Sequence, residues 1–222
     1  MILAAGRGER LAPITDTIPK PLLQVGDDSL INFHLKALAA AQVKHVVINV
    51  SYLADQIIDA VLKNKPQGLE IDFSPEPPGA LETGGGIYNA LQKIPTDSFI
   101  VVNADIWTDF DFTLLPARIN GLAHLILVSN PPHNPGGDFF LDGNHVRISS
   151  ADGSRALTFS GISVLKKELF KDCVPGRFPL APLLHAAVEK DSVSGAFFDG
   201  RWSDIGSAER LEAARSVAAL GP

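Results

Sequence analysis

The first hundred residues alternate between short apolar runs and segments whose apolar residues recur every three or four positions. Runs of the first kind predict buried strands, and segments of the second kind predict amphipathic helices. Strands are expected at 1–3, 46–50, 71–73 and 98–102, and helices at 30–41, around 57–62 and at 85–91. Ser29 is placed to cap the first of these helices. Strands that alternate with helices in this way predict a mostly parallel sheet with helices on both faces.

The second half of the chain has shorter apolar runs, separated by Pro, Gly, Asn and Asp. They predict strands at 124–128, 139–141, 146–148, 157–164 and 193–198, and helices at 167–172 and 181–189. A last helix is expected from a cap at Ser207 to about Leu220. Together the two halves predict one α/β domain over residues 1–222. Its mixed, mostly parallel central sheet is flanked by helices and carries a small antiparallel extension.

Composition narrows the class of protein. Of the 222 residues, 45% are hydrophobic and 20% are charged, as in an ordinary globular domain. The net charge of −6 argues against nucleic acid as a partner, because a phosphate backbone favours a basic surface. Cys173 is the only cysteine, which excludes a disulfide within the chain and a cysteine metal cage. No apolar run approaches the roughly 20 residues that span a bilayer, and the first residues lack a basic leader, so we expect a cytoplasmic protein.

A glycine-rich segment, Leu-Ala-Ala-Gly-Arg-Gly-Glu-Arg-Leu at 3–11, follows the first expected strand. Gly6 and Gly8 let the backbone approach a ligand and take positive φ values, and amides in such a turn cradle phosphate oxygens. Arg7 and Arg10 add cationic donors. Leu11 stands where the dinucleotide fingerprint has its third glycine, and the P-loop sequence is absent, so this is a different phosphate loop. An ordinary strand-to-helix turn is the alternative interpretation.

Three charged side chains complete the candidate chemistry. Lys20 lies between two prolines, which fix the backbone around an ammonium that could neutralise phosphate charge. Asp105 follows the strand expected at 98–102, and Asp204 lies in Trp-Ser-Asp-Ile-Gly. Two carboxylates from different loops could hold one Mg²⁺ against the α-phosphate of a nucleotide. The alternatives are a surface lysine and two aspartates that form part of their turns.

Taken together, these segments resemble the sugar-1-phosphate nucleotidyltransferase family, whose motifs they match in order over nearly the whole chain. Three further segments, at 81–86, 137–139 and 158–163, are most similar to the family members that act on N-acetylmuramate 1-phosphate. The resemblance implies a Rossmann-like nucleotidyltransferase fold, a Mg²⁺ cofactor, UTP as donor and UDP-N-acetylmuramate as product. Glu9 departs from the pattern, because many members have Ser or Thr in the loop.

The resemblance also implies a role for each matching residue. Arg10, Lys20 and Asp105 would be catalytic, with Arg10 near the β- and γ-phosphates and Lys20 beside the α-phosphate. The expected nucleotide-binding residues are Ala5, Gly6, Arg7, Gly8, Glu9, Arg10, Lys20, Glu76, Glu82, Thr83 and Gly84. The expected sugar-side residues are Asn103, Asp138 and Gly161, and the expected Mg²⁺ ligands are Asp105 and Asp204.

Several alternatives stay open. The substrates could be glucose 1-phosphate with UTP or mannose 1-phosphate with GTP, or the chain could be a nucleotide sensor without activity. The lactyl carboxylate of N-acetylmuramate would need a cation, and Arg155, Arg177 and Arg201 are candidates. The oligomeric state is not predicted, and a monomer is compatible with the sequence.

Overall fold

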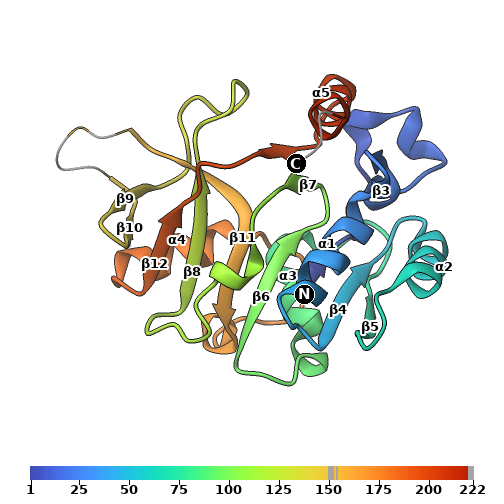
Figure 1. Ribbon diagram of the computed structural model, residues 1–222. Helices are drawn as coiled ribbons and strands as arrows, with labels where there is room; N and C mark the ends of the chain where they lie inside the picture. Colours follow the sequence, from blue (N-terminus) through green and yellow to red (C-terminus); the bar gives the residue numbers. More distant parts are fainter. Residues whose placement is uncertain (150–152, 154, 220–222) are drawn as a thin grey trace.

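The computed structural model describes residues 1–149, 153 and 155–219. A nine-stranded sheet runs through the molecule in the order β5-β4-β1-β6-β11-β8-β12-β10-β9, and helices pack along it (Figure 1). The predicted α/β fold class, a mixed central sheet with an antiparallel extension, is confirmed.

The first half of the chain forms one side of the sheet with four parallel strands. They are β1 (Ile2–Leu3), β4 (His45–Val50), β5 (Glu70–Pro75) and β6 (Ser98–Asn103). The helices between them are α1 (Leu30–Ala40), α2 (Ala54–Asn64) and α3 (Glu82–Ala90). Although β1 has only two residues, it pairs on both sides, with Ile2 opposite Ile48 of β4 and Val102 of β6. The short first strand is therefore the centre of the parallel half.

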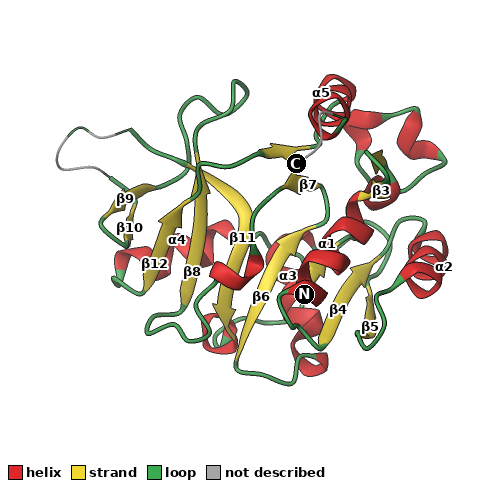
Figure 2. Ribbon diagram, in the orientation of Figure 1, coloured by secondary structure: helices red, strands yellow, loops and turns green. Residues whose placement is uncertain are grey.

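The second half adds β8 (Ala123–Val128), β9 (Phe140–Asp142), β10 (His145–Arg147), β11 (Thr158–Lys166) and β12 (Val193–Phe197) to the same sheet. Strand β11 is antiparallel to both β6 and β8, which joins the two halves without a gap. Two-stranded sheets form between β2 (Gln24–Val25) and β3 (Asp28–Ser29) and between β7 (Ile106–Thr108) and β13 (Trp202–Asp204). The predicted extension is thus a continuation of the central sheet, as Figure 2 shows.

The remaining helices include α4 (Ala181–Glu189) and α5 (Ala208–Ala218). Short 3-10 turns lie at Glu9–Leu11 (η1), Ile14–Asp16 (η2), Lys20–Leu22 (η3), Leu91–Lys93 (η4), Phe112–Leu114 (η5) and Lys167–Phe170 (η6). Three of these turns, η1 to η3, lie between β1 and β2. The segment that joins β1 to α1 therefore consists of short turns and contains no long helix.

Two hydrophobic clusters cover the two faces of the sheet. Alternate residues of β4 point to opposite sides: Ile48 packs in the cluster with α1 and α2, and Val47 packs in the cluster with α3 and α4. Strands buried on both faces explain the nearly continuous apolar runs in the sequence. A third, smaller cluster joins α5 to the turns after β1 through residues such as Leu11 and Leu211.

Several local predictions can be compared with the structure. The Ser29 and Ser207 side chains accept hydrogen bonds from the backbone amides of the first turns of α1 and α5, so both predicted caps are confirmed. Helix α3 begins at Glu82 rather than at the expected Gly85, and the expected helix at 167–172 is the 3-10 turn η6. Helix α5 ends at Ala218, and the predicted end at Leu220 lies outside the described residues.

The two apolar residues Ile57 and Leu62 of α2 provide a matched test of the packing. Ile57 is 0% exposed and Leu62 is 52% exposed, although both fit the helical pattern. We expect Ile57→Ala to lower the free energy of unfolding by about 2–5 kcal/mol, because it removes buried methyl groups and leaves a cavity. Leu62→Ala should change it by less than about 0.5 kcal/mol. Urea denaturation of both variants measures the difference, and equal losses would contradict the packing described here.

Candidate active site

The four parallel strands all end at one edge of the sheet, and a cleft of about 940 Å³ lies there. Ligand sites in open α/β sheets occur at this edge. The predicted site residues that line the cleft are Ala5, Gly6, Arg7, Gly8, Glu9, Arg10, Lys20, Glu76, Glu82, Thr83, Asn103 and Asp105. Four other predicted positions, Gly84, Asp138, Gly161 and Asp204, lie outside this lining.

The glycine-rich loop follows β1, and Thr15 supports it through a hydrogen bond to Gly8. Gly8 has φ = 70°, and a Cβ there would lie 3.2 Å from both the Lys20 Cβ and the Thr15 Cγ2, so a side chain would be both strained and crowded. The buried Thr15 hydroxyl donates a hydrogen bond to the Gly8 carbonyl at 2.9 Å. Gly6 does not have a positive φ, so of the two glycines only Gly8 adopts the left-handed conformation that glycine permits. A Cβ at Gly6 would meet no neighbouring atom within 4 Å, so this part of the loop is uncrowded.

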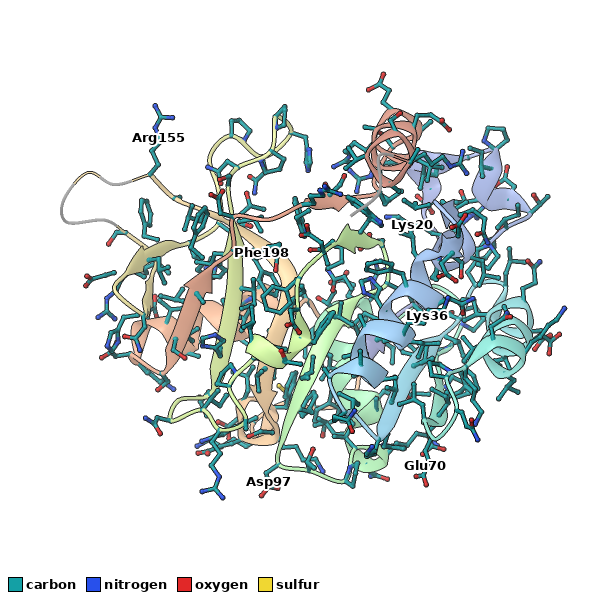
Figure 3. The ribbon with its side chains drawn as sticks, viewed as in Figure 1. Lys20, Lys36, Glu70, Asp97, Arg155 and Phe198 are labelled. Atoms are coloured by element: carbon teal, nitrogen blue, oxygen red, sulfur yellow. The ribbon has the colours of Figure 1, made fainter. Side chains whose placement is uncertain are left out.

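Lys20 is almost buried, and it forms an ion pair with Asp105. Its side chain is 10% exposed, and its Nζ lies 2.5 Å from the Asp105 Oδ2. Pro19 and Pro21 flank it, and Pro21 follows it in η3, which restricts the backbone as expected from the sequence. A buried ammonium requires a counter-charge, and Asp105 at the end of β6 provides it. The ion pair thus connects η3, which contains Lys20, to the turn after β6, which contains Asp105. Lys20 is labelled in Figure 3.

The two predicted metal ligands are neighbours through their backbones. Asp204 lies opposite Ile106 in the β7–β13 pair, and the Ile205 amide donates to the Asp105 carbonyl at 2.7 Å. The Asp204 carboxylate, however, accepts bonds from Arg210 Nη1 at 2.5 and 2.7 Å. His133 Nε2 lies 2.9 Å from the same group. Over residues 1–149, 153 and 155–219, no cluster of three or more His, Cys, Asp or Glu side chains is suited to a metal ion.

Asn49 is the centre of a second hydrogen-bond network, which the sequence reasoning missed. The network connects the glycine-rich loop to the loop after β5. The Asn49 Oδ1 accepts a bond from the Ala4 amide at 2.7 Å, and its Nδ2 donates to the Glu76 Oε1 at 2.6 Å. The other Glu76 oxygen accepts from the Leu81 amide at 2.7 Å. Asn49 is 3% exposed. An asparagine inside the apolar run 45–50 was the available signal, since a buried polar side chain needs partners.

The start of α3 is the third wall of the cleft. Glu82 has φ = 60°, which is unusual for a residue with a side chain, and its Oε1 lies 3.0 Å from the Arg177 Nε. The segment 176–180 is fixed to this wall by backbone bonds, and the Thr83 Oγ1 accepts from the Leu180 amide at 3.0 Å. Arg177 lines the cleft, although the sequence indicated it only as one of three candidate cations.

The predicted sugar-side residues are dispersed. Asn103 lines the cleft, and Gly161, with φ = 84°, lies against it: a Cβ at Gly161 would come within 2.7 Å of the Asn103 Nδ2. Asp138 instead holds its own loop, because its carboxylate accepts from the Phe159 amide at 2.8 Å and from the Asn134 Nδ2 at 3.1 Å. Its carboxylate oxygens therefore already have protein donors.

His34 supports the turn beneath Asp105. It is 0% exposed, and its Nε2 donates to the Ile106 carbonyl at 2.9 Å. Burial lowers the pKa of His34 to about 4, against the smaller opposing effects of this bond and of the Asp105 charge. The imidazole is therefore neutral near pH 7, and its role is structural.

Comparison with known proteins identifies the family of the chain. Residues 1–134 match the family model of the nucleotidyl transferases, a range that includes the glycine-rich loop, Lys20 and Asp105. The chain belongs to the nucleotidyl transferase family, and the predicted enzyme class is confirmed.

Two relatives match along almost the whole chain. One is the N-acetylmuramate alpha-1-phosphate uridylyltransferase of Neisseria meningitidis, which is 45% identical over 98% of this chain and 97% of its own length. The other is the enzyme of the same name from Caulobacter vibrioides, at 32% identity over 97% of this chain and 95% of its own length. The resemblance stated from the sequence motifs is thereby confirmed.

Solved structures share the fold. HddC from Yersinia pseudotuberculosis, complexed with GMP-PN, superposes with a TM-score of 0.78 at 26% identity and covers 98% of this chain and 97% of that one. For a putative glucose-1-phosphate thymidylyltransferase from Bacillus anthracis the TM-score is 0.84 at 18% identity, with 98% and 93% coverage. Of the described helices, none is long and apolar enough to cross a membrane.

The Asn49 network generates a prediction. Asn49→Asp keeps an acceptor for the Ala4 amide but places a second carboxylate beside Glu76, with no donor between them. We expect a loss of about 1–3 kcal/mol in the free energy of unfolding, because buried polar partners become unpaired. We also expect the KM for the nucleoside triphosphate to rise by a larger factor than kcat falls, because the glycine-rich loop and the loop after β5 should both shift. Asn144→Asp, at an exposed position, is the control. An unchanged KM in a folded Asn49→Asp protein would exclude a role for Asn49 in positioning the two loops.

Proposed function

We propose that this protein transfers a uridylyl group from UTP to N-acetylmuramate 1-phosphate, releasing UDP-N-acetylmuramate and pyrophosphate with the help of Mg²⁺. The observation that carries this proposal is the Lys20–Asp105 pair, which lies in the cleft between the glycine-rich loop and the end of β6. The choice of substrates rests on the two full-length relatives, whose names specify N-acetylmuramate 1-phosphate and uridylyl transfer.

The chemistry requires positioning and charge rather than a general base. The phosphate oxygen of the sugar 1-phosphate is already an anion, and it attacks the α-phosphorus while the bond to pyrophosphate breaks. Repulsion between the two phosphates is the main obstacle; for a unit pair at about 4 Å it is about 4 kcal/mol at an effective dielectric of 20. Lys20 is placed to reduce this repulsion, because its ammonium is fixed and nearly excluded from water.

The glycine-rich loop would bind the other end of the triphosphate. Arg7 and Arg10 are exposed and line the cleft, so their guanidinium groups are free to follow the pyrophosphate as negative charge builds on it. Arg7 stacks over the Tyr52 ring at 5.1 Å and lies 3.5 Å from the Asp16 carboxylate. Both contacts are at the surface and weak, so the side chain is available to a ligand.

The residues present fit a magnesium ion. Asp105 and Asp204 are adjacent through their backbones, and Mg²⁺ prefers few carboxylates together with water and phosphate oxygens. When bound, the ion would polarise the α-phosphate and neutralise its charge. For Asp204 to become a ligand, its bonds to Arg210 and His133 must be rearranged.

Other expectations from the sequence stay predictions. They are a single domain over residues 1–222, a cytoplasmic location, and contacts with the base and ribose of the nucleotide by Glu76, Glu82, Thr83 and Gly84. The contacts of Asp138 with its own loop favour an indirect role for that residue, as a support for the sugar side of the site.

A substrate panel tests the proposal directly. The purified protein is incubated with Mg²⁺ and each combination of UTP, GTP and dTTP with N-acetylmuramate, N-acetylglucosamine, glucose and mannose 1-phosphates, and pyrophosphate release is measured. We expect the highest kcat/KM for UTP with N-acetylmuramate 1-phosphate. A higher value for another pair would reassign the substrates, and no release with any pair would leave a nucleotide-binding protein without this activity.

Removal of either charge of the central pair should separate catalysis from folding. We expect Lys20→Met and Asp105→Asn each to lower kcat/KM by roughly a hundredfold or more, as is typical when a main electrostatic stabiliser is lost. Lys36→Met, which removes an exposed ion pair with Asp28, is the control. Circular dichroism and the melting temperature verify that each variant is folded. Near-normal turnover in a folded Asp105→Asn protein would remove that carboxylate from the proposed mechanism.

A further inference from the structure

Asp204, the second proposed Mg²⁺ ligand, is held by an arginine that follows it closely in the chain. The Arg210 Nη1 donates to both carboxylate oxygens of Asp204, at 2.7 Å to Oδ1 and at 2.5 Å to Oδ2. The Arg210 and Asp204 side chains are only 20% and 25% exposed, so solvent screens this pair less than a pair at the open surface. We infer that Arg210 competes with Mg²⁺ for the Asp204 carboxylate and so limits the affinity of the site for the ion. The inference rests on the proposed function, which assigns the ion to Asp105 and Asp204.

The guanidinium occupies the space between the two carboxylate oxygens of Asp204. Because one nitrogen bonds both oxygens, a cation that approaches from this side would meet the guanidinium first. The Arg210 Nη2 lies against Gly206, where a Cβ would overlap it. Gly206 lines the cleft, whereas Asp204 does not. Arg210 therefore holds the carboxylate beside the cleft lining rather than in it.

The two proposed ligands differ in the oxygens that they leave for an ion. In the part of the chain that the structure describes, the Asp105 carboxylate accepts a side-chain hydrogen bond only from Lys20, and this bond uses Oδ2. The Oδ1 of Asp105, a residue that lines the cleft, can therefore reach an ion while the ion pair with Lys20 stays intact. At Asp204 both oxygens are already bonded to Arg210. The competition is thus expected at Asp204 and not at Asp105.

Arg210 is positioned by the fold and does not extend freely from the surface. It lies in the first turn of α5, and its amide donates to the capping Ser207 Oγ at 3.3 Å. The next residue, Leu211, is 1% exposed and packs in the cluster that contains Leu11. On the other side of the guanidinium, His133 Nε2 lies 2.6 Å from the Arg210 Nη1. The charge next to Asp204 is therefore a fixed feature of the site, and Arg210 is a positioning residue that acts through Asp204.

Electrostatic repulsion adds to the competition for space. A divalent cation on Asp204 would lie next to the guanidinium if Arg210 kept its present position, and like charges at so short a distance repel strongly. The ion can bind Asp204 only after the carboxylate and the guanidinium separate. Removal of the guanidinium should therefore strengthen the binding of a divalent cation, whereas removal of a group that merely supported the fold should not.

The test measures the affinity of the protein alone for Mn²⁺, which takes the same kind of oxygen ligands as Mg²⁺ and whose free concentration is followed by electron paramagnetic resonance. We expect Arg210→Met to bind Mn²⁺ more tightly than the unmodified chain by roughly tenfold or more, because a fixed positive charge beside the ligand is removed. Addition of Asp204→Asn to Arg210→Met should abolish the gain.

Arg215→Met is the matched control. Arg215 lies in the same helix and is also paired with a carboxylate, that of Glu212, so its replacement changes the net charge equally. The affinity of this variant for Mn²⁺ should equal that of the unmodified chain. The melting temperature of each variant verifies that it is folded.

Two results would overturn the inference. One is equal or weaker Mn²⁺ binding by a folded Arg210→Met protein, since weaker binding would make the guanidinium a group that orients the ligand. The other is a gain that persists when Asp204→Asn is added, since the ion would then bind elsewhere. The proposed function is tested separately by the substrate panel. No pyrophosphate release from any pair would reject that function, whereas unchanged Mn²⁺ affinity of Arg210→Met in an active enzyme would reject only the role of Arg210.

Discussion

The structure depends on the pairing of β1 between β4 and β6. Two residues of β1 form parallel ladders on both sides, and so the segment after Leu3 emerges between the ends of two longer strands. The carboxyl ends of parallel strands face the same way, so side chains separated widely in the sequence converge at one edge. For this reason Asn49 of β4 bonds the Ala4 amide, Glu76 after β5 bonds Asn49, and Asp105 after β6 pairs with Lys20. The cleft is a direct consequence of strand direction.

The charged side chains at this polar edge balance one another. The nearly buried Lys20 is neutralised by Asp105, and Asp204 is neutralised by Arg210. Of these groups only the Lys20 ammonium is nearly buried, so it is the charge for which loss of the partner is most costly. A phosphate approaching Lys20 would therefore exchange one anion for another instead of meeting an unsatisfied site. Such an arrangement positions the reacting groups before the substrate arrives.

Much of the fold could be predicted from the sequence, because the apolar pattern reports burial. The strands on both sides of the sheet, the caps at Ser29 and Ser207 and helix α4 followed from local patterns. The pattern could not reveal that Leu62 is 52% exposed, because exposure depends on how the helix packs in the fold. The glycine-rich loop and Asp105 could be identified because each follows an expected strand, and Lys20 because two prolines flank it. The orientation of the Asp204 carboxylate toward Arg210 could not be predicted, because a contact between side chains depends on rotamers that a motif does not encode.

The distribution of these contacts suggests a division of labour along the chain. Residues 1–134, which match the family model, contain the glycine-rich loop, Lys20 and Asp105, whereas Asp204, the second proposed Mg²⁺ ligand, lies in the second half. The second half adds two arginines that pair with acidic residues: Arg177 pairs with Glu82 in the cleft lining, and Arg210 pairs with Asp204, which lies outside that lining. The fold and the transfer chemistry do not by themselves specify a sugar or a base, so substrate choice depends on the side chains that surround the shared groups.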